Sequence, residues 1–257
     1  MSRSLADRVA IVTGAGGGIG RAAALRLAAD GAQVACVDIA DDAAGASADA
    51  VIAAGGEALP LALDISTDDG NLEMVARTAE RFGGLDVLHA NAAVQRMGKL
   101  PEASVEDWDA LFRTNLLGVG LGIKAALPEL AARGGGAVIV TASLLGIVGD
   151  PDMPAYGAMK GGLRAMCRSL AAAHGPENIR FNTICPGDVE TPMLADFFAH
   201  QPDPAAARRE IVERYPLRRF ARPEDVANLV AFLASDDAAY LTGIDIPIDG
   251  GLLAQIY

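Results

Sequence analysis

The sequence has few lysines, few cysteines and no long hydrophobic run, and each shortage excludes a class of protein. Hydrophobic residues make up 51% of the 257 positions. They fall in runs of about five or six, which are too short to cross a bilayer. Residues 1–8 carry charges but lack the apolar stretch of a secretory signal. We therefore expect a cytoplasmic chain that spans no membrane.

The cysteines and histidines do not form a metal-binding or disulfide pattern. There are three cysteines, an odd number, at Cys36, Cys167 and Cys185, and no two of them form a CxxC pair. They lie in apolar stretches, which favours reduced packing residues over a disulfide or a zinc site. The three histidines are scattered along the chain, so we expect no catalytic metal.

Basic residues are also scarce, because 21 Lys and Arg face 33 Asp and Glu, for a net charge of −12. Sequence-independent binding of nucleic acid needs clustered basic residues, so we expect no nucleic-acid partner. Only Lys99, Lys124 and Lys160 are lysines. Each of them is therefore a candidate for a specific role.

The sequence does contain a regular alternation of short apolar runs and helical stripes. The apolar runs predict strands at Val9–Thr13, Gln33–Asp38, Ala58–Ala62, Val87–Ala90, Ala137–Thr141, Arg180–Ile184 and Ile244–Ile248. Helical spacing between them predicts crossovers, among them long helices over Val105–Leu130 and Tyr156–His174. Strands joined in this way run parallel and need helices on both faces. We predict an α/β, doubly wound (Rossmann) fold, with one domain over residues 1–257 and a seven-stranded parallel sheet flanked by helices.

One segment, Gly187–Arg219, interrupts the alternation. It contains two short helical patterns, Leu194–Ala199 and Ala205–Arg214. Ligands of doubly wound sheets bind at the carboxyl ends of the strands. We therefore expect a helical excursion at about 188–219 to cover the substrate.

A glycine-rich loop, Thr13–Gly20, follows the first strand and leads into a helix. Such glycines allow a tight turn and a close approach of backbone to pyrophosphate, while the helix N-terminus faces the phosphates. The candidate cofactor contacts are Gly14, Gly18, Ile19 and Gly20. Glycine-rich turns follow strands in many proteins, so the motif needs a second signal.

Asp38 supplies that second signal, because it ends the second strand 18 positions after Gly20. A carboxylate there accepts hydrogen bonds from the ribose hydroxyls of NAD, although it is also suited to cap the next helix. It opposes the extra phosphate of NADP by up to about 4 kcal/mol at about 4 Å and an effective dielectric near 20. Neither Gly17 nor Ile39 offers a compensating cation, so we predict NAD as the cofactor.

Two further strand ends offer cofactor contacts. Asp64 and Ile65 follow the third strand, where they are candidates to lie beside the adenine. Asp64 is also suited to cap the following helix. Asn91 follows the fourth strand among small residues, where the backbone must pass close to the cofactor or simply makes a tight turn.

Four polar residues form the candidate catalytic group. Tyr156 and Lys160 are four positions apart at the start of a helix, so their side chains share one face. Ser143 ends the fifth strand, and Asn115 lies in the long preceding helix. Each has an ordinary structural reading: a helix-start aromatic, a solvated charge, a turn residue and a buried amide.

Together these motifs resemble one family, the short-chain dehydrogenases/reductases, nearly from end to end. The motifs are Thr13–Gly20, Asn91-Ala-Ala, Asn115, Ser143, Tyr156-x-x-x-Lys160, Pro186-Gly187, Arg222-Pro-Glu-Asp-Val-Ala and Asp249-Gly-Gly. The sequence departs from the usual pattern at Ala90 and Ala93, where asparagine and glycine are common. These two positions supply no catalytic side chain, so the departure concerns only the placement of that loop.

The resemblance implies that Tyr156 is the general acid/base of hydride transfer between NAD(H) and a secondary alcohol or ketone. Its pKa would have to fall from about 10 to about 7, at a cost of about 4 kcal/mol, for half of the phenol to be ionised at neutral pH. Lys160 and the positive nicotinamide would favour that fall, and Lys160 would hold the ribose. Ser143 would bind the substrate oxygen, and Asn115 a water that links Lys160 to solvent. The resemblance adds cofactor contacts at Pro186, Gly187 and Thr191, and a homotetramer.

The loops around this site mix apolar walls with a few polar anchors. The candidates are Val94, Gln95, Arg96, Leu144, Leu145, Met153, Asp188, Met193, Phe197 and Phe198, among which Gln95, Arg96, Leu145 and Asp188 are the expected substrate contacts. The mixture favours a small sugar, polyol or cyclic alcohol over a long acyl chain. The final segment, 252–257, packs either on its own chain or on a neighbouring subunit.

Three other functions compete with this one. A 3-oxoacyl-(acyl carrier protein) reductase would favour NADPH and a basic docking face, against the acidic balance of this chain. A non-catalytic NAD(H)-binding protein would not need the intact Ser143, Tyr156 and Lys160. A sugar-nucleotide epimerase or dehydratase would carry a larger C-terminal domain, for which no residues remain.

Overall fold

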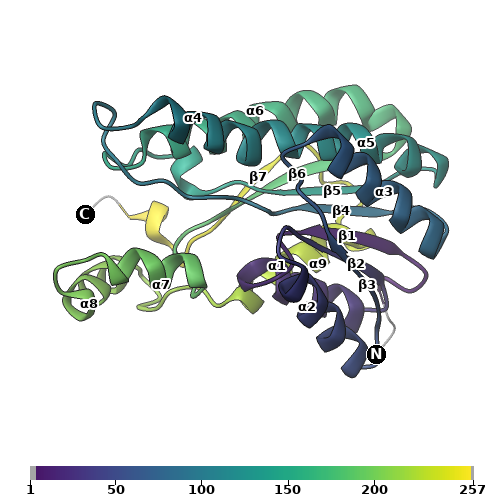
Figure 1. The fold of residues 1–257 in the computed structure, drawn as a ribbon, viewed down its shortest axis with the longest axis horizontal. Helices are drawn as coiled ribbons and strands as arrows, with labels where there is room; N and C mark the ends of the chain where they lie inside the picture. Colours follow the sequence, from purple (N-terminus) through teal and green to yellow (C-terminus); the bar gives the residue numbers. More distant parts are fainter. Residues whose placement is uncertain (1–3, 256–257) are drawn as a thin grey trace.

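A twisted sheet of seven parallel strands runs through the computed structural model, which describes residues 4–255 (Figure 1). The strands are β1 (Val9–Thr13), β2 (Gln33–Asp38), β3 (Glu57–Ala62), β4 (Val87–Ala90), β5 (Gly136–Thr141), β6 (Ile179–Pro186) and β7 (Asp245–Ile248). Their order is β3-β2-β1-β4-β5-β6-β7, and each neighbouring pair is parallel. The order reverses between β1 and β4, which is where doubly wound sheets bind ligands. The predicted doubly wound fold is confirmed.

Helices cover both faces of the sheet (Figure 1). On one face lie α1 (Gly18–Ala29), α2 (Asp41–Ala53) and α9 (Pro223–Ala234), and on the other α3 (Asp68–Phe82), α4 (Val105–Phe112), α5 (Gly118–Ala132) and α6 (Pro154–His174). Short 3₁₀ turns lie at Leu144–Gly146, Gly175–Glu177, Asp236–Ala238 and Leu252–Ala254.

The apolar strands supply two cores, because alternate side chains of a strand point to opposite faces of a sheet. Ala10 and Val12 of β1 join the core that also contains residues of α1 and α9. Val9 and Ile11 join the core that contains residues of α3, α5 and α6. All four side chains are buried, which explains why the strand reads as a continuous apolar run.

The helix predicted over Val105–Leu130 is present as one continuous helical stretch, Val105–Ala132. Residues Arg113–Leu117 form a π-helical turn between α4 and α5. A π turn contains an extra residue in one turn, and such turns are frequent at functional sites. The long helix is therefore confirmed, but the apolar spacing of the sequence does not reveal the single inserted residue of its π turn.

The stretch Val105–Ala132 is also long and apolar enough to cross a membrane, when judged by length and composition alone. In this fold, however, it is part of the layer on the sheet. Its α5 segment contacts α3, β4 and β5, and its α4 segment contacts α6. Packing of this kind is typical of a core helix.

Two helices of the excursion predicted at about 188–219 are α7 (Pro192–Ala199) and α8 (Pro204–Arg214). Each begins with a proline, and each is capped by the preceding residue, Thr191 for α7 and Asp203 for α8. Figure 1 shows the pair standing out from the sheet at the carboxyl ends of the strands. This placement puts both helices beside the loops that build the site.

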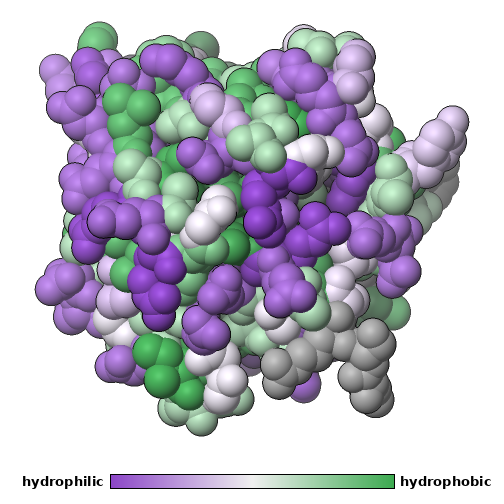
Figure 2. Space-filling view, turned by 90° about the vertical axis from the view of Figure 1, so that its right-hand side faces the viewer, coloured by the Kyte–Doolittle hydropathy of each residue, from purple (hydrophilic) through white to green (hydrophobic). Residues whose placement is uncertain are grey.

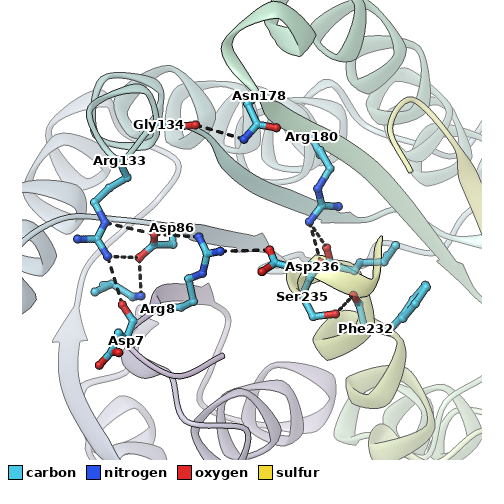
Figure 3. Close-up of polar contacts among 12 residues, drawn as sticks. Asp7, Arg8, Asp86, Arg133, Gly134, Asn178, Arg180, Phe232, Ser235 and Asp236 are labelled. Atoms are coloured by element: carbon cyan, nitrogen blue, oxygen red, sulfur yellow. Dashed lines mark hydrogen bonds and ion pairs between the residues drawn. The ribbon is translucent and has the colours of Figure 1, made fainter. Parts of the chain in front are cut away.

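The opposite edge of the sheet, at the amino ends of the strands, carries an ion-pair network (Figure 3). Asp86 is 3% exposed and accepts hydrogen bonds from the Val9 backbone at 2.8 Å and from Arg133 at 3.1 and 3.2 Å. Arg8 lies 3.4 Å from the same carboxylate and 3.1 Å from Asp236. Figure 2 shows this edge of the molecule, which is largely hydrophilic. The network joins β1, β4 and the end of α5 away from the site.

Candidate active site

A cavity of about 640 Å³ lies at the carboxyl edge of the sheet, where the loops after β1, β4, β5 and β6 meet α6, α7 and α8. It brings together most of the residues predicted from the sequence: Gly14, Gly18, Ile19, Asp38, Asn91, Gln95, Ser143, Leu145, Tyr156, Lys160, Pro186, Gly187, Asp188 and Thr191. Residues from six separate parts of the chain therefore face a single space.

The glycine loop presents bare backbone to this cavity. Gly14 and Gly18 have φ angles of +64° and +51°, which favour glycine. A Cβ atom at Gly14 would lie 2.8 Å from the Ala92 Cα, and one at Gly20 would lie 2.0 Å from the Gly14 carbonyl oxygen. Gly17 caps α1 without a side-chain hydrogen bond, so the first amides of the helix stay free. This surface fits the pyrophosphate of a dinucleotide.

Asp38 at the end of β2 is half-buried and lines the same cavity. Its Oδ2 accepts a hydrogen bond from the Gly16 amide at 2.9 Å, and its Oδ1 accepts one from the Ala40 amide at 3.1 Å. The carboxylate therefore holds the glycine loop and remains at the cavity wall. Its acceptor oxygens suit the hydroxyls of a ribose.

The pair predicted from its spacing, Tyr156 and Lys160, begins helix α6. Pro154 occupies the first turn, and both side chains are buried, with exposed fractions of 9% and 2%. The Lys160 ammonium donates a hydrogen bond to the Thr141 carbonyl at 2.7 Å. It lies 5.5 Å from the centre of the Tyr156 ring, so the cation and the phenol form one unit.

Ser143 completes the group two residues beyond the end of β5. Its Oγ accepts a hydrogen bond from the Leu145 amide at 3.1 Å, and its hydroxyl hydrogen-bonds the Tyr156 phenol, which lowers the phenol pKa. Ser143 and Tyr156 both line the cavity. A carbonyl or alcohol oxygen between them can therefore contact both hydroxyls.

The ionisation of this group is governed by burial. Burial raises the pKa of Tyr156 to about 12, against the opposing hydrogen bond of Ser143. Burial also lowers the pKa of Lys160 to about 8. The lowered phenol pKa expected from the sequence is therefore absent in the protein alone. Tyr156 is a proton donor at neutral pH, and its conversion to a base costs about 7 kcal/mol there.

At the substrate end, Gln95, Leu145 and Asp188 line the cavity as predicted, but Arg96 does not. Arg96 is exposed and lies 3.6 Å from Asp107. An exposed guanidinium remains hydrated and pairs at the surface. The structure therefore places Arg96 outside the pocket that the sequence assigned to it.

Comparison with known proteins decides the family. A protein-family model with the description enoyl-(acyl carrier protein) reductase matches residues 14–253. The chain is 40% identical to cis-4-hydroxycyclohexanecarboxylate dehydrogenase of Sinomonas cyclohexanicum, over 99% of this chain and 100% of that protein. The chain belongs to the short-chain dehydrogenase/reductase family. It is an oxidoreductase that uses a nicotinamide cofactor.

Two further members of this family resemble it closely. The 2,5-dichloro-2,5-cyclohexadiene-1,4-diol dehydrogenase of Sphingobium indicum is 36% identical, with 98% of both proteins covered. The crystal structure of levodione reductase superposes with a TM-score of 0.95 at 35% identity, over 98% of this chain and 100% of that one. The fold and the family thus agree.

Asn115, the fourth residue of the family pattern, lies fully buried in the π turn. Its amide forms two hydrogen bonds with the Val94 backbone, each 2.8 Å long. These bonds fix the loop that carries Gln95 into the cavity. The water-binding role of Asn115 stays a prediction.

The predicted adenine contacts lie apart from the cavity. Asp64 is exposed, and its Oδ1 accepts a hydrogen bond from the Ser66 amide at 2.8 Å. Ile65 is buried in the core on the α3 face. Neither residue lines the cavity, so their contact with a cofactor also stays a prediction.

A buried polar chain beneath Lys160 was missed by the sequence reasoning. His89 Nε2 lies 3.0 Å from the Thr141 hydroxyl, which in turn donates a hydrogen bond to Asn91 Oδ1 at 3.1 Å. Burial lowers the pKa of His89 to about 3, so its ring is neutral. Asn91 continues to the Thr13 carbonyl at 3.2 Å. The chain links the glycine loop to the strand whose carbonyl holds Lys160.

Other cavity residues were also missed, because they come from distant segments. They are Asp150, Ile211, Arg214, Tyr215 and Leu252. Leu252 and Leu253 pack on Ala142, Leu144 and Cys185 of the same chain. The predicted contact of the final segment, 252–257, also includes residues 256–257, which lie outside the described part of the structure. A sequence signal for these residues is lacking, since none of them belongs to one of the motifs.

Proposed function

We propose that this chain is an NAD-dependent dehydrogenase/reductase that interconverts a secondary alcohol and a ketone on a small sugar, polyol or cyclic compound. The observation that carries the proposal is the joint burial of Tyr156 and Lys160 in a cavity that also contains Ser143 and Asp38. The four side chains come from three separate parts of the chain, the end of β2, the loop after β5 and helix α6. Each of their ordinary structural readings leaves their meeting in one cavity unexplained.

Each side chain has a task that its contacts allow. With substrate bound, Ser143 donates its hydroxyl proton to the substrate oxygen in place of the phenol, and Tyr156 gives a proton to that oxygen or takes one from it. Lys160 has three donors, of which Thr141 uses one, so two remain for the hydroxyls of the nicotinamide ribose. The bound cofactor accepts or supplies the hydride and, when oxidised, carries a positive charge.

Proton transfer in the oxidative direction requires help for Tyr156. The Lys160 ammonium, at 5.5 Å from the phenol ring, stabilises a phenolate by about 3 kcal/mol at an effective dielectric near 20. This is less than half of the cost of about 7 kcal/mol for ionising the phenol at neutral pH. We infer that Tyr156 becomes a base only in the complex with the positively charged cofactor.

The preference for NAD rests on Asp38, whose carboxylate lines the cavity and would hold the ribose hydroxyls. NADP would place a phosphate against this negative charge, on a chain whose net charge is already −12. The same features oppose a 3-oxoacyl-(acyl carrier protein) reductase, which would need NADPH and a basic surface for its carrier. Cofactor choice therefore separates the two functions.

We also propose that the chain acts as one catalytic unit in a cytoplasmic homotetramer, without a catalytic metal. Cys36, Cys167 and Cys185 are buried free thiols, which suits a reducing compartment. Sedimentation at four times the chain mass of 26.4 kDa supports the tetramer, and sedimentation as a monomer refutes it. Activity that disappears with a chelator would refute metal independence.

The direct test is a screen of alcohols with NAD⁺, followed by NADH absorbance. We expect turnover of at least one small secondary alcohol, polyol or cyclic alcohol, and a kcat/KM for NAD⁺ far above that for NADP⁺. A protein that binds NADH but oxidises no alcohol and reduces no ketone would be a non-catalytic cofactor-binding protein. Comparable activity with NADPH on an acyl thioester would support the carrier-protein reductase instead.

A further inference from the structure

The substrate end of the cavity contains a carboxylate that the reaction itself does not use, Asp188. It follows Pro186 and Gly187 at the end of β6 and lines the cavity. The phenol of Tyr215, which is 2% exposed, donates a hydrogen bond to Asp188 Oδ2 at 2.8 Å. The same phenol oxygen accepts a hydrogen bond from the Asp188 amide at 2.8 Å. Tyr215 therefore fixes both the side chain and the backbone of Asp188.

One oxygen of this carboxylate remains free. The Asp188 carbonyl accepts a hydrogen bond from the Ala221 amide at 3.0 Å, so the amide, the carbonyl and Oδ2 all have partners. Within residues 4–255, Oδ1 has none. A fixed acceptor in a ligand cavity is the kind of polar group that orients a ligand and selects it.

The surroundings place this acceptor close to the reacting group. A Cβ at Gly187 would lie 2.8 Å from the Tyr215 hydroxyl and 3.3 Å from Leu144 Cδ1. Leu144 directly follows Ser143, which we propose to bind the substrate oxygen. A small substrate that contacts Ser143 with one oxygen can therefore reach Asp188 with another polar group.

The charge around Asp188 is negative. Asp150 also lines the cavity, and burial together with the charge of Asp150 raises the pKa of Asp188. The cation at this end, Arg214, is exposed and forms an ion pair with Glu210. An anionic substrate would thus meet two carboxylates and a guanidinium that is already paired, whereas a neutral hydrogen-bond donor would relieve the buried charge.

We propose that Asp188, held by Tyr215, determines substrate specificity: its free Oδ1 accepts a hydrogen bond from a second hydroxyl, so the enzyme selects uncharged diols and rejects carboxylates. This inference rests on the proposed alcohol dehydrogenase function. It separates the chain from its relative named for 4-hydroxycyclohexanecarboxylate, whose substrate name includes a carboxylate.

Two matched sets of substrates test the proposal. The cyclic set is cyclohexanol, the isomeric cyclohexanediols and 4-hydroxycyclohexanecarboxylate. The open-chain set is butan-2-ol, butane-2,3-diol and 3-hydroxybutyrate. With NAD⁺, we expect the best diol to exceed its mono-alcohol in kcat/KM by about tenfold or more, because hydrogen bonds to charged groups are strong. The kcat/KM for the carboxylate should be lower than that for the mono-alcohol by a similar factor.

The decisive variant is Asp188→Asn. With Tyr215 still bonded to the side-chain oxygen, the amide presents an N–H donor to the cavity in place of an acceptor. We expect the ratio of diol to mono-alcohol to fall by about tenfold, and the ratio of carboxylate to mono-alcohol to rise by about tenfold. If Asp188 had a purely structural role, the variant would lower kcat/KM for all three substrates by the same factor. Both ratios would then stay unchanged.

Two further variants complete the experiment. Tyr215→Phe keeps the ring against Phe198 and Phe220 but releases Asp188, so the diol preference should fall while the rejection of carboxylates remains. Asp196→Asn removes an exposed carboxylate of α7 that does not line the cavity, and both ratios should stay unchanged. Circular dichroism and NADH binding verify that each variant is folded.

The outcomes separate the two proposals. Equal activity on diols and mono-alcohols, or ratios that Asp188→Asn leaves unchanged, would overturn the role of Asp188 alone. An enzyme that oxidises other alcohols in the screen but neither set of diols would overturn it as well. A protein that oxidises no alcohol with NAD⁺ would overturn the proposed function itself.

Discussion

Replacing Asp38 by asparagine removes one negative charge from the cofactor end of the cavity with little change in volume. In the unmodified protein, the carboxylate accepts two backbone hydrogen bonds, from Gly16 and Ala40. The single side-chain oxygen of asparagine can still accept one of them. The repulsion removed is up to about 4 kcal/mol for unit charges about 4 Å apart at an effective dielectric near 20. Because the carboxylate is half-exposed, we discount this value to about 2 kcal/mol, or about thirtyfold in affinity.

The assay is steady-state kinetics with NAD⁺ and NADP⁺ on the best alcohol of the screen. We expect Asp38→Asn to raise kcat/KM for NADP⁺ by about thirtyfold, and to lower that for NAD⁺ because the ribose loses a charged acceptor. Asp41→Asn is the matched control, since Asp41 is exposed in the first turn of α2. If kcat/KM for NADP⁺ in Asp38→Asn stays within about threefold of its value in the unmodified enzyme, the electrostatic argument is refuted.

Three further predictions concern the loop, the buried histidine and the opposite edge of the sheet. Gly14→Ala should weaken NADH binding, measured by fluorescence, by about tenfold or more, because φ is +64° and the Cβ would lie 2.8 Å from backbone. The control is Gly45→Ala in α2, which has nothing within 4 Å and does not line the cavity, and it should change binding little. The pKa of His89 is about 3 in the folded protein and about 6.5 in the unfolded chain. Between these two pH values, unfolding takes up a proton, so the free energy of unfolding falls as the pH falls from about 6.5 to about 3. Between pH 6 and pH 4, the free energy of unfolding in urea should therefore fall by about 1.4 kcal/mol more per pH unit than in His89→Val, and equal slopes would contradict the buried neutral ring. Asp86→Ala should lower the free energy of unfolding by about 1–3 kcal/mol, because it leaves the buried Val9 amide without its acceptor, whereas Asp236→Ala at the surface should lower it by less than about 1 kcal/mol.

The fold could be predicted because its signals are local. Apolar runs such as Val9–Thr13 and the helical stripes between them repeat with the strand and helix periods, and parallel strands follow from the crossovers. The cofactor end of the site follows in the same way, since Gly14, Gly18 and Asp38 all lie at strand ends. A doubly wound sheet brings such ends to a single edge.

The rest depends on contacts between distant segments. Asp188 and Tyr215 are 27 residues apart, and spacing alone does not indicate that the phenol holds the carboxylate. Arg96 lies next to Gln95 in the chain, yet only Gln95 faces the cavity. The ionisation of Tyr156 also depends on three-dimensional burial, which raises the phenol pKa and outweighs the hydrogen bond of Ser143.

The central claim is that the Tyr156 phenol transfers the proton of an alcohol dehydrogenase reaction, and Tyr156→Phe tests it most directly. This change removes the proton donor and little volume. We expect kcat to fall by about 10²–10⁴-fold, the usual contribution of a general acid or base, while the Kd for NADH stays nearly unchanged. Tyr240→Phe, at a fully exposed position, should retain full activity. An unchanged kcat in Tyr156→Phe would contradict the account.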